Sequence, residues 1–103
     1  MTTITGELTS ISRVPVLQTD GANWLIFSNR FKHFINSKAL WGHFDGTSPR
    51  PVPPAVQVEI DEWDKHEHEA RNYLVQKLKD ATLQADDHPT VVEMWDWIKN
   101  GFT

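Results

Sequence analysis

The segment of this chain most suggestive of metal chemistry is residues 66–69, which read His-Glu-His-Glu. A metal pair on a helix needs its ligands about one turn apart, as in the His-Glu-x-x-His arrangement. His66 and His68 are two residues apart, so they point to different faces of a helix. The other three histidines are scattered and the chain has no cysteine. The pattern favours a solvated polar face, and we expect no metal and no other cofactor.

A second segment rich in chemistry-bearing side chains is residues 59–64, which hold four carboxylates. A hydrolytic acid pair must flank a cleft, with one acid in an apolar pocket that raises its pKa. Acids gathered at the start of a helix instead complement the helix dipole. The sequence also has no Gly-x-Ser-x-Gly elbow and no glycine-rich phosphate loop. We therefore expect no catalytic activity.

Composition and charge restrict the class of protein. A chain of 103 residues with 39% apolar and 23% charged residues is expected to fold as one domain. Residues 1–50 carry five Lys/Arg against three acids, whereas residues 51–103 carry five against eleven. Nucleic-acid-binding proteins usually show a dense basic patch, so direct nucleic-acid binding is not expected.

No apolar run approaches the length of a membrane span, and the first seven residues do not resemble a signal peptide. We therefore expect no membrane association and a cytoplasmic protein.

The elements that would position these side chains are mostly helices. The turn at 19–23 is followed by a first helix, predicted from Asn23 as N-cap to about Leu40. Its apolar stripe is Trp24, Phe27, Phe31, Phe34 and Ile35. The glycines of residues 40–46 are expected to end it, Gly42 or Gly46 taking a positive φ.

The proline-rich residues 49–54 could bind an SH3 or WW domain, but the spacing favours a connector between two helices. The second helix is predicted from about Ala55 to Ala81, with Asp61–Lys65 and Glu67–Arg71 as ion pairs. Its expected apolar face is Ile60, Trp63, Ala70, Leu74, Leu78 and Ala81.

Residues 82–89 are predicted as a loop, and Thr90 opens a third helix through a capping box with Glu93. The expected stripe of that helix is Val91, Met94 or Trp95, Ile98 and Phe102. Residues 1–18 are expected to form an extended arm, with a strand or hairpin over 1–17, beside a helical domain at 19–103. The aromatic stripes could stack bases or hold a peptide, but their spacing is that of a core face.

Four of these patterns, taken in order, resemble the N-terminal part of copia-type LTR retrotransposon Gag polyproteins. The first is a Gly and an Asn before an aromatic helix, and the second is a Leu-Trp pair that closes this helix. The third is a Trp-containing helix after a proline-rich spacer, and the fourth is a Thr-[Ala/Val]-x-Glu-x-Trp opening. The residues that carry these matches are Gly21, Asn23, Trp24, Phe27, Phe31, Leu40, Trp41, Trp63, Ala70, Leu74, Leu78, Thr90, Glu93 and Trp95.

The resemblance implies a small capsid-like bundle of three or four helices that acts in particle assembly through weak contacts between copies. Such Gag proteins continue into further helices and a Cys/His zinc knuckle that binds RNA, and this chain has neither. A fragment, a degenerate copy and a host-retained remnant all remain open. The alternative function is a host-retained module that binds a peptide or protein in a groove between its helices or along the N-terminal strand.

Overall fold

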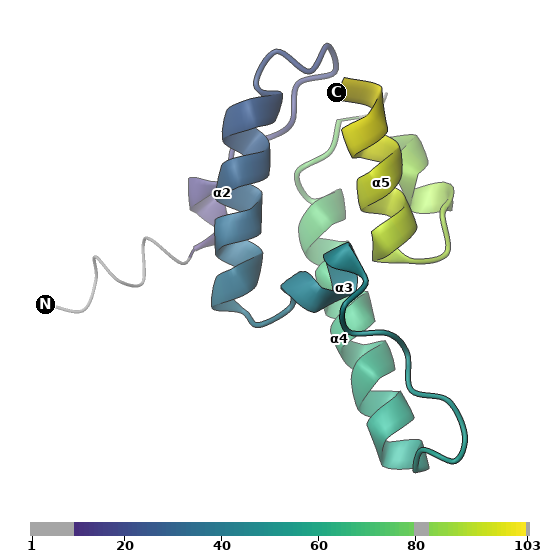
Figure 1. Cartoon of the computed structure of the whole chain (residues 1–103). Helices are drawn as coiled ribbons and strands as arrows, with labels where there is room; N and C mark the ends of the chain where they lie inside the picture. The colour runs from purple at the N-terminus through teal and green to yellow at the C-terminus, as the bar shows by residue number, and fades with distance from the viewer. Residues whose placement is uncertain (1–9, 80–82, 103) are drawn as a thin grey trace, which may run out of the picture.

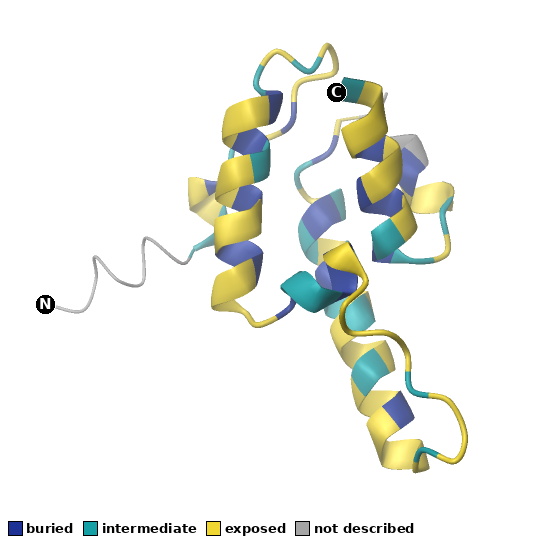
Figure 2. Cartoon of the chain, in the orientation of Figure 1, coloured by how far each residue is buried: buried dark blue, intermediate teal, exposed yellow. Residues whose placement is uncertain are grey.

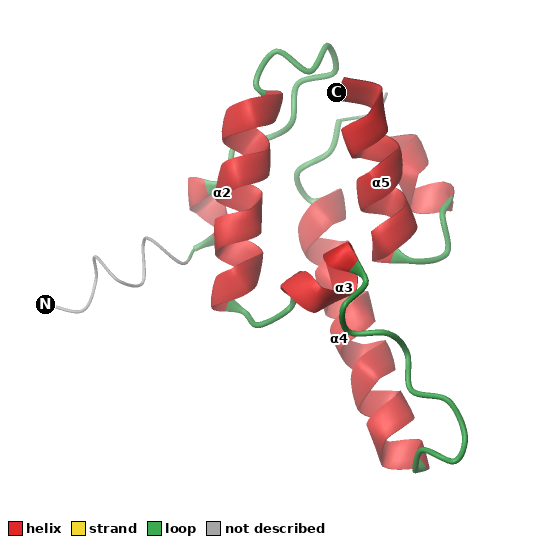
Figure 3. Ribbon diagram, in the orientation of Figure 1, coloured by secondary structure: helices red, strands yellow, loops and turns green. Residues whose placement is uncertain are grey.

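The computed structural model describes residues 10–79 and 83–102. These residues form a mainly helical bundle that contains no strand, which confirms the predicted fold class (Figure 3). Its elements are η1 (Ile11–Arg13), α2 (Trp24–Ser37), α3 (Trp41–Asp45), α4 (Gln57–Val75), η2 (Leu83–Asp87) and α5 (Val91–Phe102), η denoting a 3-10 helix.

The molecule is flat, with extents of 45 × 40 × 19 Å. The short helix α3 lies between α2 and α5, and α4 runs behind them (Figure 1). The N-terminal half of α4 projects beyond the other helices, together with the proline-rich connector at 49–54. We call this part, residues 51–62, the projecting tip.

Aromatic side chains from three helices build the core around Trp95 of α5. Its ring lies 5.4 Å from that of Phe31 and 5.5 Å from that of Trp24, both on α2. Trp41 and Phe44 of α3 approach the same indole edge-on, at 5.6 and 5.9 Å. Ring pairs at these distances add to the stability that burial alone provides. The two aromatic stripes predicted at helical spacing thus face each other in one core, with α3 between them.

Residues 10–17 are neither strand nor hairpin, so the prediction for this segment is wrong where the structure describes it; residues 1–9 lie outside the described part. Ser10 accepts a hydrogen bond from the Ser12 backbone N–H and starts the 3-10 turn η1. The chain then inserts Val14 and Leu17 fully into the core. The Leu17 N–H is bonded to the Lys77 carbonyl, 2.8 Å away, so the segment pairs with a helix end instead of with another strand.

The first predicted helix ends at Ser37, earlier than expected, in a Schellman motif. Leu40 N–H bonds to the Ile35 carbonyl at 3.1 Å, and Ala39 N–H bonds to the Asn36 carbonyl at 3.0 Å. This geometry requires a left-handed residue, and Ala39 takes it with a φ of 59°. The Leu-Trp pair therefore opens α3, a helix that the sequence did not predict, and Gly46 ends α3 with a φ of 83°.

The second predicted helix is shorter than expected at both ends. It begins at Gln57 and ends at Val75, not at Ala81, which lies outside the described residues. After Val75 the N–H groups of Lys77 and Leu78 bond three residues back, which tightens the last turn. Leu78 still reaches the core, but from this turn and not from a helix.

Candidate functional site

Most of the residues that carry the Gag-like patterns build the core. Eight are buried, and these are Trp24, Phe27, Phe31, Leu40, Ala70, Leu74, Leu78 and Trp95. Five are half-buried, and these are Gly21, Asn23, Trp41, Trp63 and Thr90; Glu93 is exposed. The buried positions lie on the sides of the helices that face one another (Figure 2), so most of these residues hold the bundle together.

Asn23 precedes α2 as predicted, but its side chain makes no capping hydrogen bond. Its Oδ1 instead accepts from the Gln18 N–H at 2.9 Å, and its Nδ2 donates to the Val16 carbonyl at 2.9 Å. The amide therefore fixes the chain that enters α2. Gly21 has a φ of 73°, and a Cβ there would overlap the ring of Phe102. Both residues fix the conformation of this loop, a role that the prediction of Asn23 as an N-cap did not include.

At the start of α5 the Thr90 half of the predicted capping box is present, and a second cap is added from α4. The Thr90 Oγ1 accepts the Glu93 N–H at 3.3 Å, as a capping residue does. The Val91 N–H is bonded to the Glu67 Oε2 of α4 at 2.8 Å. A carboxylate at a helix N-terminus is favoured by the helix dipole.

Glu67 has a second partner that sequence reasoning missed. Its Oε1 lies 2.9 Å from the Nδ1 of His43, and the two side chains are only 13% and 5% exposed. One carboxylate thus joins α3, α4 and α5. The predicted Glu67–Arg71 pair is wrong, because Arg71 instead donates to Asp86 and to two carbonyls in the connection to α5. His43 follows shortly after the Leu-Trp pair, and no periodic pattern in the sequence predicts its contact with Glu67.

Trp63 lies beside this pair and not in the main core, contrary to the predicted stripe. Its ring stacks on that of His43 with 4.7 Å between centroids, and its Nε1 donates to the Ser48 carbonyl at 2.7 Å. The indole therefore attaches the connector after α3 to α4. It also lines a hollow of about 430 Å³ between that connector and the start of α5, with Pro49 and Pro89 on its walls.

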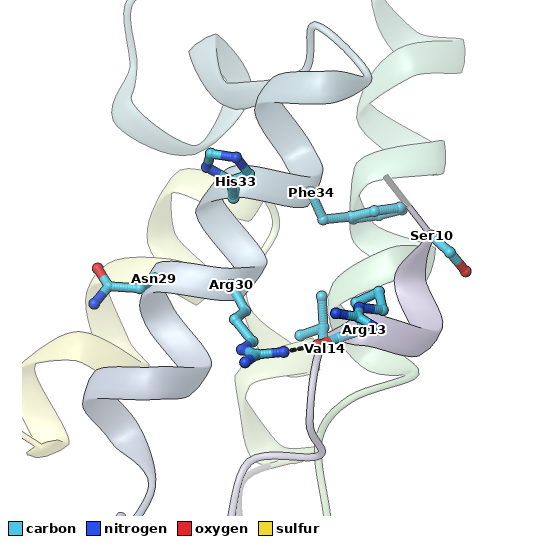
Figure 4. A pocket seen from close by; sticks show the side chains of 7 residues that line it. All are labelled: Ser10, Arg13, Val14, Asn29, Arg30, His33 and Phe34. Carbon is cyan, nitrogen blue, oxygen red and sulfur yellow. Dashed lines mark hydrogen bonds between the residues drawn. The ribbon is translucent and has the colours of Figure 1, made fainter. Parts of the chain in front are cut away.

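A second hollow, of about 330 Å³, lies between η1 and α2 (Figure 4). Arg30 and Phe34 extend from α2 toward the N-terminal segment, and Arg30 donates to the Arg13 carbonyl at 3.2 Å. His33 and the Arg13 side chain also line it. We call these four residues, with the volume between them, the basic hollow.

Large apolar side chains are exposed at the start of two helices. Leu25 and Ile26, in the first turn of α2, are 77% and 49% exposed. Val56 and Val58, at the start of α4, are 56% and 64% exposed. The two groups belong to different parts of the molecule, because the start of α4 lies on the projecting tip (Figure 1). Neighbouring exposed apolar side chains of this kind are candidates for contact sites.

The histidines and acids considered for metal or acid chemistry are exposed on α4, apart from Glu67 and Glu69. His66 and His68 are exposed, and the His66 Nε2 lies 4.0 Å from a Glu62 oxygen. Within residues 10–79 and 83–102, no group of three His, Asp or Glu side chains is placed to bind a metal ion. Asp64 forms a bidentate pair with Arg50, and the hydrogen bonds from Arg50 lower the pKa of Asp64.

No helix in the described part of the chain has the length and apolar character needed to cross a membrane. Comparison with known proteins found no matching family model, no matching curated protein and no matching solved structure.

Proposed function

We propose that this chain is a structural, non-catalytic capsid-like domain of the copia Gag type, which acts in particle assembly through weak contacts between copies in the cytoplasm. The observation that carries the proposal is the distribution of apolar side chains. The aromatic residues of the Gag-like patterns on α2 and α5 are buried inside the bundle, whereas Leu25, Ile26, Val56 and Val58 are exposed at helix ends.

The burial of the aromatic set and the exposure of the aliphatic set favour assembly over the capture of a ligand by aromatic side chains. A groove lined by the predicted stripes would leave Phe27 and Phe31 accessible, but both are fully buried. Small apolar surfaces at the ends of helices suit contacts that are weak one by one and effective when many are linked.

The test is self-association of the isolated chain over a wide concentration range. We expect a monomer at micromolar concentration by size exclusion with light scattering, and measurable association by sedimentation near millimolar. Fusion to a trimer-forming scaffold should strengthen that association through effective concentration. A chain that stays monomeric at millimolar concentration and on the scaffold would contradict the assembly role.

The hollow beside Trp63 supports a second candidate, the host-retained module that binds a peptide or protein. Its volume of about 430 Å³ and the Trp63 ring suit an apolar or proline-containing segment. Shift changes confined to the residues of this hollow, seen by NMR on titration with a proline-rich peptide, would favour that module. A stable dimer that does not dissociate on dilution would also favour it over a capsid-like domain.

A further inference from the structure

We propose that the projecting tip of one copy docks head-to-tail on the basic hollow and outer face of α2 in a second copy. The inference rests on the proposed assembly function and names the two surfaces that would carry it.

The receiving surface is basic and partly apolar. Ile26, Arg30 and His33 follow one another at the i, i+4 and i+7 positions of α2, so they share its outer face. Residues 21–44 contain three Lys/Arg and no acid. Within the described residues, neither the Arg13 guanidinium nor the His33 ring has a hydrogen bond or an ion pair, so both are available to a carboxylate.

The inserting surface has the opposite charge and the same mixed character. Val58, Asp61 and Glu62 occupy the i, i+3 and i+4 positions of α4, so one exposed valine is flanked by two exposed carboxylates. Residues 51–64 contain four acids and no Lys or Arg. Lys65 comes next, about one turn of α4 after Asp61 and nearer to the other helices. Asp64 is already neutralised by Arg50, whereas Asp61 accepts from the uncharged Gln57 amide at 2.9 Å and Glu62 lies 4.0 Å from the exposed His66, so both acids can still pair with a cation of a partner.

Shape and charge point to one arrangement between copies. The inserting surface lies on a projection and the receiving surface includes a hollow, so a copy presents one of each. Two tips facing each other would bring acids together, and two α2 faces would bring arginines together. Like charges placed opposite one another oppose association. The contact is therefore heterologous, the type that produces rings or filaments instead of closed dimers.

The test uses a charge swap measured by sedimentation equilibrium up to millimolar concentration. The variant Arg13→Glu/Arg30→Glu has an acidic hollow, and the variant Asp61→Lys/Glu62→Lys has a basic tip. Each variant alone should associate at least about tenfold more weakly than the wild type, because its own surfaces repel. An equimolar mixture should regain association, because every contact between unlike copies is then attractive.

The matched control is Asp96→Lys, an exposed charge change on α5 away from both surfaces. It should associate like the wild type, and thermal melts should show that all variants fold. Association by the charge variants that equals that of the wild type would overturn the docking surfaces but leave the assembly function standing. A mixture that fails to regain association would also overturn them. Absence of association in the wild type, both at millimolar concentration and on the trimer-forming scaffold, would overturn both.

Discussion

At the scale of single residues, the Glu67 carboxylate joins three helices, α3, α4 and α5. It accepts from His43 and from the Val91 N–H, so its loss leaves two nearly buried donors without a partner. We expect Glu67→Ala to lower the free energy of unfolding by about 1–3 kcal/mol for each group left unpaired. Urea denaturation would measure the loss.

The control for this substitution is Glu62→Ala, which removes an exposed carboxylate from the same helix. It should change the free energy of unfolding by no more than about 0.5 kcal/mol. Equal effects of the two substitutions would show that the contact between Glu67 and α5 contributes nothing to stability.

A substitution at Ala39 is expected to raise the free energy of unfolding, whereas the substitution at Glu67 lowers it. Ala39 is exposed and holds a φ of 59°, a conformation that strains any residue with a Cβ. Ala39→Gly should therefore raise the free energy of unfolding by about 1 kcal/mol. Gly46→Ala is the mirror control, because Gly46 has a φ of 83° with no atom near an added Cβ, and it should lose a similar amount. A lower melting temperature for Ala39→Gly would refute the strain argument.

At the scale of elements, Arg71 connects α4 to the segment that leads into α5. Its guanidinium donates to the Asp86 carboxylate and to the carbonyls of Asp86, His88 and Pro89. Arg71→Lys should cost about 1–3 kcal/mol, because an ammonium group cannot reproduce this planar set of donors. Arg50→Lys is the matched control, since its pair with Asp64 is about half exposed and such pairs contribute little, so it should change stability far less than Arg71→Lys. Chemical denaturation of both variants checks the difference.

The sequence predicted which faces of the elements are buried better than it predicted where the elements end. The stripe from Trp24 to Ile35 and that from Val91 to Ile98 are buried as expected, because helical spacing reports burial directly. The early end of α2 is a local Schellman motif, but it depends on a left-handed Ala39 that no sequence pattern marks, whereas the end of α4 has a distant partner. Leu17 bonds the carbonyl of Lys77, and no local pattern encodes such a contact.

The candidate surfaces were less predictable than the core, because they depend on contacts between residues that are far apart in the sequence. The charge difference between the two halves of the chain is visible in the sequence. The basic hollow exists only because η1 packs against α2, in a segment where a strand or hairpin was expected. His43 and Glu67 are 24 residues apart, and only the fold brings them together.

At the scale of the whole molecule, the tryptophans should divide into three classes by their position. Trp95 lies in the centre of the core, so Trp95→Ala should cost about 3–5 kcal/mol. Trp63 is half-buried outside that core, and its truncation should cost less than that of Trp95. Trp97 is 38% exposed, and its truncation should cost the least. Denaturant midpoints of the three variants give the order, and a loss for Trp63→Ala as large as that for Trp95→Ala would contradict it.

The net charge of the whole molecule determines how strongly it is expected to bind RNA. The formal net charge is −4, and Arg13 and Arg30 line one hollow, whereas Lys32 lies over the Trp41 ring, so the cations of η1 and α2 form no dense patch. Affinity for nucleic acid comes mainly from cationic contacts to phosphates and falls steeply with salt when few are made. We therefore expect fluorescence anisotropy with a single-stranded RNA to show no binding tighter than about 10⁻⁴ M at physiological salt. Any weak binding at low salt should vanish in Arg13→Glu/Arg30→Glu and persist in Asp96→Lys. Binding that survives physiological salt would mean that the acidic half of the molecule does not repel the RNA backbone, and the domain would then have a role in packaging as well as in assembly.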